Sequence, residues 1–309
     1  MRIGLTGGAA TPDKLVRQAQ RAEADGFTSL WYASTVLGDP LTPMARAGRA
    51  TSTIELGTAV LQTYPCHPLL QANRAASAAA TMGRPGLTLG IGPSHEALIR
   101  GVYGLSYDRP GQSTEEYVRI LTALLHGEEV DFAGEEWTTR SAGGRMTATG
   151  QPPVPVLLSA LSPRMLRVAG QYADGTVLWM APARAVGEHI APRLTAAAEA
   201  AGRPAPRIVA GLPVVVHDDT AEARAAVAAT SGTYAGMPSY QRILDIGGAD
   251  SPADAAIVGN EESVGKQLKS LLDAGATDIW AAIVPAGPDP AASVRRTRDL
   301  LRGAAASPH

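Results

Sequence analysis

Short apolar runs alternate along the whole chain with longer segments in which apolar residues recur every three or four positions. Gly, Pro or Asp bounds each apolar run, as is typical of buried strands. Eight runs predict strands at residues 2–5, 27–33, 54–63, 86–92, 154–160, 175–181, 207–216 and 277–284. The segments between them predict helices, such as residues 12–26, where Leu15, Ala19 and Ala22 share one face. Continuous apolar strands separated by helices indicate a parallel sheet covered on both faces.

Eight strands with their helices predict a closed (β/α)8 TIM barrel, with a doubly wound open sheet as the main alternative. The junctions "ADGFTSLW", "ADGTVLW" and "AGATDIW" repeat a glycine at a helix end directly before a buried strand. A repeated unit of this kind favours the barrel, although any α/β protein reuses glycine at helix ends. No linker or shift in composition divides the chain, so we predict a single domain over residues 1–309.

Two segments exceed a minimal barrel. Residues 130–153 predict a short hairpin followed by a Gly-rich loop, and residues 231–260 form a long insertion after the seventh strand and its helix. Insertions on a barrel most often lie on the face where ligands bind. Between the fourth strand and the hairpin, residues 113–127 predict a helix, with Ser113 and Glu116 at the spacing of a capping box.

The composition of the chain bears on its binding partners and its cellular location. The chain has 309 residues, 45% of them hydrophobic and 18% charged, with a net charge of −2, which argues against a nucleic-acid-binding protein. Cys66 is the single cysteine, so no intramolecular disulfide forms and a cytoplasmic location is expected. No run reaches the roughly 18 apolar residues that span a bilayer, so no membrane partner is expected. The six histidines show no metal-binding spacing, so we predict no metal site.

The residues at the predicted strand ends are small, apolar and Gly-rich, with hydroxyls, one histidine and one arginine among them. In a barrel these ends form the active site. They contain neither a Ser-His-Asp arrangement nor a pair of carboxylates for glycoside hydrolysis. A mostly apolar slot with a few donors suits an aromatic ring cofactor better than hydrolysis.

Motifs along nearly the whole chain resemble the luciferase-like monooxygenase superfamily, in particular its deazaflavin (coenzyme F-420)-dependent oxidoreductases. The matching stretches are "AEADGFTSLWY", "IELGTAVLQTYPCHP", "GLTLGIGPSHEALIRGVYGLSYDRP", "EEYVRILTALLHGEEVDFAGEEW", "PVPVLLSALSPRMLRVAGQYADGTVLW" and "VGNEESVGKQLKSLLDAGATDIW". "GIGPSH" together with "YDRP" favours a deazaflavin user over a user of FMN.

The resemblance implies a cofactor site at particular residues. A non-proline cis peptide behind the cofactor ring would lie at Ala59-Val60, which the residues alone would suggest is an ordinary strand end. Gly90 and Gly92 would permit close approach of the backbone to the cofactor. Ser34 and Ser94 complete the contacts expected in this part of the site.

The cofactor phosphate would lie at the loop that opens the helix after the fifth strand. Backbone N–H groups at a helix N-terminus attract an anion, and Ser162 and Arg164 would add side-chain donors. The alternative is a plain helix cap. The residues of this expected phosphate loop are Ser159, Ala160, Leu161, Ser162 and Arg164.

Candidate catalytic residues follow the same resemblance. His95 stands where some deazaflavin enzymes keep an acidic residue, and would donate a proton while hydride arrives from the cofactor; a structural histidine is the alternative. Glu96 takes this role if the loop shifts by one residue. Tyr64 and Tyr107 are possible phenolic acids or packing residues. "YPCHP", which contains Cys66, favours a structural loop over a reactive thiol.

One departure from the family bears on the reaction. Sugar-phosphate dehydrogenases of the deazaflavin branch carry an Asp-His pair after the second strand, whereas this chain has Ser34 and Thr35. We therefore predict reduction of a C=C, C=N or C=O bond in a small organic substrate by reduced coenzyme F-420. An FMN-dependent two-component monooxygenase and a non-catalytic flavin-binding barrel are the alternatives. Dimers are common among relatives, so a homodimer is possible.

Overall fold

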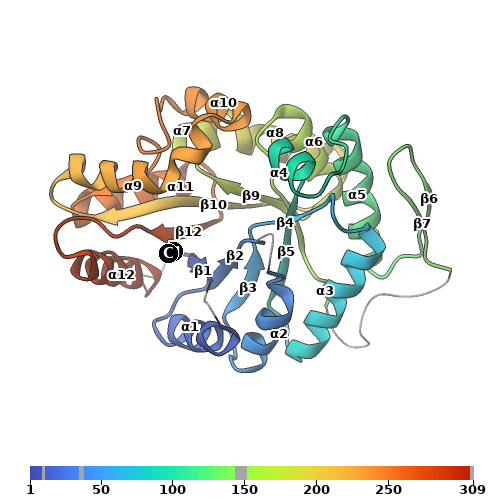
Figure 1. Cartoon of the computed structure of the whole chain (residues 1–309), viewed down its shortest axis with the longest axis horizontal. Coiled ribbons are helices and arrows are strands. Elements are labelled where there is room, and N and C mark those ends of the chain that lie inside the picture. The colour runs from blue at the N-terminus through green and yellow to red at the C-terminus, as the bar shows by residue number, and fades with distance from the viewer. Residues whose placement is uncertain (9–10, 35–37, 143–151, 307–309) are drawn as a thin grey trace.

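Eight parallel strands close into a barrel in the computed structural model, which describes residues 1–8, 11–34, 38–142 and 152–306 (Figure 1). Strand β1 pairs with both β2 and β12, and β9 pairs with β10, so the sheet has no open edge within this set. The prediction of a TIM barrel is therefore confirmed, and the open sheet is excluded. The barrel strands are β1 (Ile3–Gly7), β2 (Ser29–Tyr32), β3 (Glu55–Thr58), β5 (Leu87–Gly92), β8 (Val156–Leu158), β9 (Gly175–Trp179), β10 (Arg207–Val216) and β12 (Asp278–Ile283).

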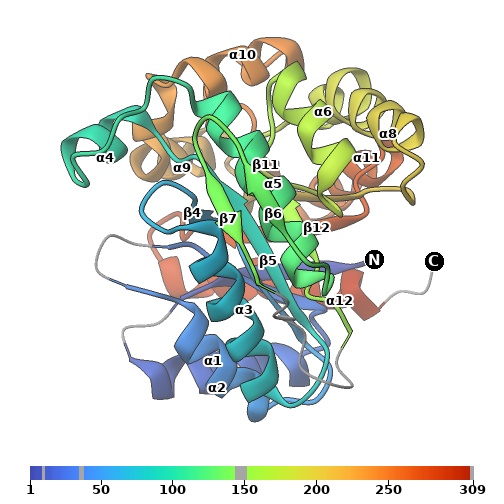
Figure 2. The same ribbon diagram turned by 90° about the vertical axis from the view of Figure 1, so that its right-hand side faces the viewer.

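Helices surround this barrel and cover the outside of its strands (Figures 1 and 2). In the first of them, Leu15, Ala19 and Ala22 form the buried face, as the spacing predicts. The helices that connect consecutive barrel strands are α1 (Pro12–Ala24), α2 (Leu41–Arg49), α3 (Pro68–Met82), α5 (Pro110–Leu125), α6 (Pro163–Tyr172), α8 (Ala191–Ala200), α11 (Glu261–Asp273) and, after the last strand, α12 (Pro290–Ala306).

Both predicted insertions are present. Strands β6 (Asp131–Ala133) and β7 (Thr138–Arg140) form an antiparallel hairpin; the Gly-rich loop expected after it falls mostly on residues 143–151, outside the described residues. The second insertion consists of α10 (Pro238–Gly247) and β11 (Ile257–Gly259), and follows α9 (Thr220–Ala235). Helix α9 is longer than expected, since it runs through residues 231–235 that were assigned to the insertion.

The predicted capping box is wrong. Helix α5 begins at Pro110, because proline is well suited to the first helical turn, and so Ser113 lies inside the helix. Ser113 Oγ accepts a hydrogen bond from Trp137 Nε1 at 2.9 Å. The buried carboxylate of Glu116 accepts three backbone N–H bonds, at 2.9–3.0 Å, from residues 135–137. The two side chains therefore fix the β6–β7 hairpin to the barrel.

Two tryptophans fill the inside of the barrel, each opposite a glycine of the neighbouring strand. Trp31 is in register with Gly57, and Trp280 is in register with Gly211. A Cβ atom on Gly57 would lie 2.4 Å from Trp31 Cζ3, and one on Gly211 would lie 2.0 Å from Trp280 Cε2. Only glycine leaves room for the indoles, so these pairs fix the packing of the interior.

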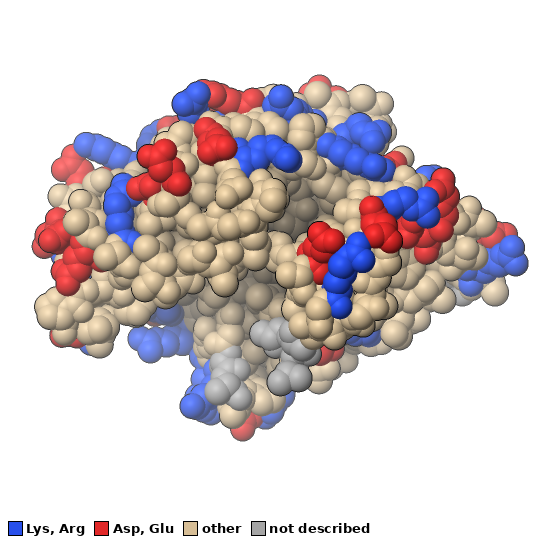
Figure 3. Space-filling model, turned by 45° about the horizontal axis from the view of Figure 1, so that its top comes forward, with Lys and Arg blue, Asp and Glu red and all other residues tan. Residues whose placement is uncertain are grey.

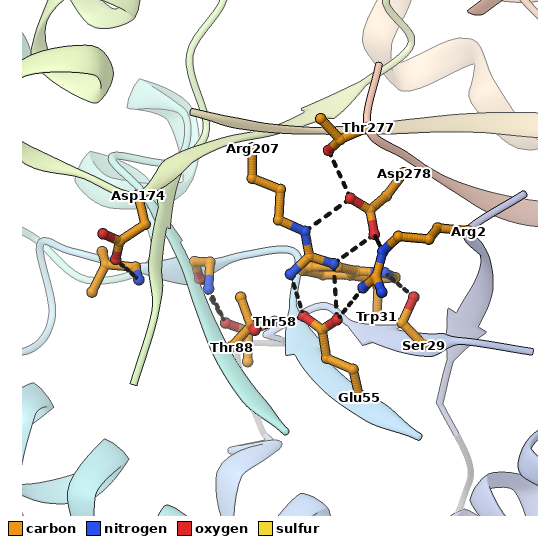
Figure 4. Close-up of polar contacts among 12 residues, drawn as sticks. Arg2, Ser29, Trp31, Glu55, Thr58, Thr88, Asp174, Arg207, Thr277 and Asp278 are labelled. Atoms are coloured by element: carbon orange, nitrogen blue, oxygen red, sulfur yellow. Dashed lines mark hydrogen bonds and ion pairs between the residues drawn. The ribbon is translucent and has the colours of Figure 1, made fainter. Parts of the chain in front are cut away.

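Charged side chains close the end of the barrel where the strands begin (Figure 4). Arg207 donates to both oxygens of Glu55, at 2.6 and 2.8 Å, and to both oxygens of Asp278, at 2.9 and 2.7 Å. Arg2 adds bonds to the same two carboxylates. We call these four residues the foot network. It connects β3, β10 and β12, together with the residue that precedes β1, across the barrel.

Candidate active site

A cavity of about 740 Å³ opens at the other end of the barrel, where the strands finish. Figure 3 shows this face hollowed, with an uncharged wall and the Lys, Arg, Asp and Glu side chains outside it. The volume falls within the usual range for small-molecule sites, and the location matches the active sites of TIM barrels. The wall comes from the ends of β1, β2, β5, β8, β9 and β12, together with α9 and α10.

The wall of this cavity carries no Asp, Glu, Lys or Arg among the described residues. Among the described lining residues, His95 is the one side chain whose ordinary pKa lies near neutrality. Its ring is half-buried, and burial lowers its pKa below the usual value. The described wall of the mouth therefore holds no Asp, Glu, Lys or Arg, whereas the foot network at the opposite end brings two arginines and two carboxylates together.

The peptide bond between Ala59 and Val60 is cis, as the resemblance implies. Both residues line the cavity and pack against the cluster around Trp31 and Trp280 inside the barrel. The N–H of Ser34 donates to the Val60 carbonyl at 3.3 Å, so Ser34 lies at the same part of the wall. Thr35 lies outside the described residues.

The two glycines of β5 have different surroundings. Gly90 is enclosed between strands and does not line the cavity: a Cβ atom there would lie 1.9 Å from the Thr58 carbonyl oxygen. Thr58 Oγ1 bonds both backbone groups of Gly90, at 2.7 and 2.8 Å. Gly92 does line the cavity, and a Cβ atom there would meet Ser159 Cβ at 3.1 Å. Gly90 is therefore required by the barrel wall, and only Gly92 is placed to contact a ligand.

The turn after β5 presents Ser94 and His95 to the cavity. Ser94 has a φ of 64°, an uncommon conformation for a residue other than glycine. The Tyr107 hydroxyl donates to the Ser94 carbonyl at 2.8 Å, which fixes the turn, and burial raises the pKa of Tyr107 to about 12. The next residue, Glu96, begins α4 (Glu96–Gly101), is exposed, and forms an ion pair with Arg100 at 2.8 Å. His95 therefore faces the cavity, whereas Glu96 lies outside it.

The loop after β8 contributes Ser159, Leu161 and Ser162 to the wall. Ser162 Oγ accepts from the N–H of Met165 at 3.3 Å and so caps α6. Ala160 is fully buried in the core, and does not line the cavity.

The structure places Arg164 away from the expected phosphate position. Its guanidinium lies against α5, where Nη2 is 3.0 Å from Gln112 Oε1 and 3.3 Å from Glu115 Oε2. It does not line the cavity. The side chain thus joins α6 to α5.

Tyr64 lies behind the cavity wall, not in it. Its ring packs against Tyr107, with the centroids 5.1 Å apart, and burial raises its pKa. Tyr107 is the member of this pair that lines the cavity. Cys66 is buried, and Arg74 Nη1 donates to its Sγ at 3.5 Å, which agrees with the structural loop expected there.

Four aromatic residues of the wall were assigned no role from the sequence, although Trp179 was expected at a strand end of the active site. Trp179 and Trp280 stack with their ring centroids 4.9 Å apart, and Tyr234 and Tyr240 reach the cavity from α9 and α10. The buried Nε1–H of Trp179 has no acceptor in good hydrogen-bond geometry among the described residues, although the Tyr234 hydroxyl lies beside it. The two tyrosines of "YAGMPSY" in the insertion were the available signal, since aromatic residues are scarce in this chain.

The described residues contain neither a candidate metal centre nor a membrane-spanning helix. No group of three or more His, Cys, Asp or Glu residues is arranged to hold a metal ion. No helix combines the length and apolar character that crossing a membrane requires.

The sequence profile of the luciferase-like monooxygenases matches residues 1–306. The chain belongs to this family. It is an oxidoreductase of the luciferase-like class, which agrees with a barrel whose uncharged mouth suits a redox cofactor better than hydrolysis.

Named relatives in the family differ in their chemistry. A 5,10-methylenetetrahydromethanopterin reductase of Methanolobus tindarius is 28% identical over 89% of this chain and 91% of its own length. An F-420-dependent hydroxymycolic acid dehydrogenase of Mycobacterium tuberculosis is 33% identical over 69% of this chain and 62% of its own. The FMN complex of a type II Baeyer-Villiger monooxygenase from Pseudomonas putida has a TM-score of 0.72 at 16% identity, over 98% of this chain and 97% of that one. The structural match shows a shared fold.

Proposed function

We propose that this protein uses reduced coenzyme F-420 to reduce a C=C, C=N or C=O bond in a small organic substrate. The observation that carries the proposal is the cavity at the barrel mouth, whose described wall holds no Asp, Glu, Lys or Arg and presents His95 as its one imidazole. The dehydrogenase relative that depends on F-420 supports the choice of cofactor.

The residues of the mouth fit a flat ring system with a phosphate attached. The wall is apolar around Ala59, Val60 and Trp179, and the buried Trp179 Nε1–H would donate to a ring heteroatom in place of the Tyr234 hydroxyl that lies beside it. Ser159 and Ser162 supply hydroxyls beside the first turn of α6, where backbone N–H groups favour an anion. These two serines, rather than Arg164, would hold the phosphate.

When bound, reduced F-420 supplies a hydride. The protein would hold the substrate in the neutral cavity and supply the proton that completes the reduction. His95 is suited to this step because its ring faces the cavity, and because its position is fixed by the turn that Tyr107 holds. Only the imidazolium form donates readily, so the lowered pKa of His95 implies faster turnover at mildly acidic pH.

An FMN-dependent monooxygenase is the second candidate. It is favoured by the fold shared with the FMN-containing Baeyer-Villiger enzyme, and the hydroxyls of the phosphate loop would serve FMN equally well. A barrel that binds a flavin-like ligand without turnover is the third.

Titration of the purified protein with oxidised F-420 and with FMN separates these candidates. We expect F-420 to bind at least tenfold more tightly, and its reduced form to be oxidised in the presence of a suitable enone or imine. Tighter binding of FMN, with oxygen uptake when reduced FMN is supplied, would overturn the proposal in favour of the monooxygenase. Tight F-420 binding without oxidation by any acceptor would favour the non-catalytic barrel.

A further inference from the structure

Five rings form a continuous aromatic arc in the cavity wall: Trp280, Trp179, Tyr234, Tyr240 and His95. Consecutive ring centroids along the arc are separated by 4.9, 6.1, 5.0 and 6.0 Å. The arc begins in the barrel interior at β12 and β9, continues through α9 and α10, and ends at the turn after β5. Elements far apart in the sequence thus present one aromatic surface to the same cavity.

The rest of the wall near the arc is also uncharged. Its side chains are apolar or carry neutral hydroxyl or amide groups, with Leu98, Met165 and Ile283 among the apolar ones. A carboxylate or phosphate on a substrate bound beside the arc would lose its water of hydration and meet no Lys or Arg among the described lining residues. Burial of such a charge without a partner is strongly unfavourable.

We propose that the substrate is a neutral, ring-containing molecule, bound against the aromatic arc, and that anionic substrates are rejected. The inference rests on the proposed function for the kind of bond that is reduced. The arc itself favours planar apolar groups, since aromatic pairs gain from offset and edge-to-face contacts beyond the burial of their area. A cationic substrate would also be attracted by ring faces, but the described wall offers no carboxylate to replace its hydration.

Three probes that share one phenylpropenyl skeleton test this choice: methyl cinnamate, which is neutral, cinnamate, which is anionic, and cinnamyltrimethylammonium, which is cationic. Each is titrated by calorimetry at pH 7.5 into the protein saturated with F-420. We expect the ester to bind at least tenfold more tightly than either ion. Equal or tighter binding of cinnamate or of the ammonium probe would overturn the inference.

Variants of the arc and its rim sharpen the test. Tyr240→Leu and Tyr234→Leu should weaken ester binding about fivefold or more, whereas Tyr234→Phe, which keeps the ring, should bind the ester like the parent. Ser239→Lys places a cation on the exposed rim of the cavity and should improve cinnamate binding about tenfold. Thr233→Lys is the matched control, since it adds the same charge to an exposed position of α9 that does not line the cavity. Equal gains for both lysine variants would contradict a local effect in the cavity.

The two proposals fail in different ways. Weak ester binding to protein that holds F-420 tightly would overturn the neutral-substrate inference and leave the proposed function standing. Failure to bind F-420 would instead overturn the proposed function. In that case the same three probes are titrated into the protein without cofactor, where the arc predicts the same order of affinity.

Discussion

The two ends of the barrel differ in their charged side chains. At the foot network, two arginines and two carboxylates are held together by hydrogen bonds of 2.6–3.0 Å, and the Asp278 side chain is only 2% exposed. The mouth, with about 740 Å³ of space, has no Asp, Glu, Lys or Arg in its described wall. Paired arginines and carboxylates hold the strands of the foot network together. An uncharged cavity wall, in contrast, leaves space for a ligand that carries its own reactive group. Stability and function are thus separated along the barrel axis.

The largest effect is expected from Arg207→Leu. The substitution leaves Arg2 as the one cation, among the described residues, bonded to both Glu55 and Asp278, so a largely buried negative charge is uncompensated, which should lower the free energy of unfolding by about 3–5 kcal/mol. Urea unfolding measures this loss. Cofactor affinity of the variant that remains folded should stay within twofold of the parent. A loss of cofactor affinity well above twofold, measured at a low temperature where the variant is folded, would contradict the separation of the two ends.

The next effect concerns the mouth. His95→Gln should lower turnover about 100-fold, the lower end of the range for a general acid, while cofactor affinity changes less than threefold. Steady-state kinetics and F-420 titration measure the two quantities. Glu96→Gln is the matched control, because the neighbouring carboxylate is exposed and paired with Arg100 outside the cavity. Loss of turnover in the control, with none in His95→Gln, would move the proton donor by one residue.

The two ends should respond to pH in different ranges. Burial alone would raise the pKa of Asp278, but bonds from Arg207 outweigh it and lower the pKa. A carboxyl with a lowered folded pKa stabilises the fold above its unfolded value of about 3.9, and this contribution is lost as the pH falls further. The unfolding free energy difference between parent and Asp278→Asn should therefore be constant from pH 7.5 to 5 and shrink below about pH 4.

Turnover should change in a higher range, because burial lowers the pKa of His95 from an ordinary value of about 6.5. As general acid, His95 must carry a proton, so the rate should rise as the pH falls below about 6.5 and reach a plateau below its folded pKa. The rise should be absent in His95→Gln. A rate that falls with acid in the parent would show that neutral His95 is the active form.

The smallest effect is expected from Arg164→Ala. Its guanidinium bonds residues of α5, so F-420 affinity should change less than twofold and stability by less than about 1 kcal/mol. Ser162→Ala should weaken F-420 binding about tenfold, since it removes a hydroxyl beside the expected phosphate. A stronger effect of the arginine than of the serine would return the phosphate contact to Arg164.

The strands and the site differ in how far the sequence predicts them. All eight barrel strands were predicted, because apolar runs between Gly, Pro and Asp report burial directly. The family resemblance added the Ala59-Val60 cis bond. Arg164 was expected at the phosphate, but its guanidinium bonds acceptors on α5 that are about 50 residues away in the sequence, which no local pattern reports. The spacing of Ser113 and Glu116 was misread for the same reason, since their partners belong to the hairpin.

The aromatic arc was missed because its rings become neighbours only in the folded barrel. Trp179 and Trp280 belong to β9 and β12, and Tyr234 and Tyr240 to helices beyond the seventh strand. Periodicity describes one element at a time, so it assigned the tryptophans to buried strands and left the tyrosines in an insertion of unknown role.

The location of Tyr234 and Tyr240 also affects how this enzyme can change over evolution. Both rings are carried by α9 and α10, at the edge of the segment added to the basic barrel, while the foot network and the loop after β8 belong to the barrel itself. Substitutions confined to this inserted segment would therefore change which substrates bind, without altering the barrel strands. The barrel strands and the loop after β8 would stay unchanged while the preferred substrate changed. The same inserted segment, transferred to another barrel of this family, would bring its aromatic surface and substrate preference with it.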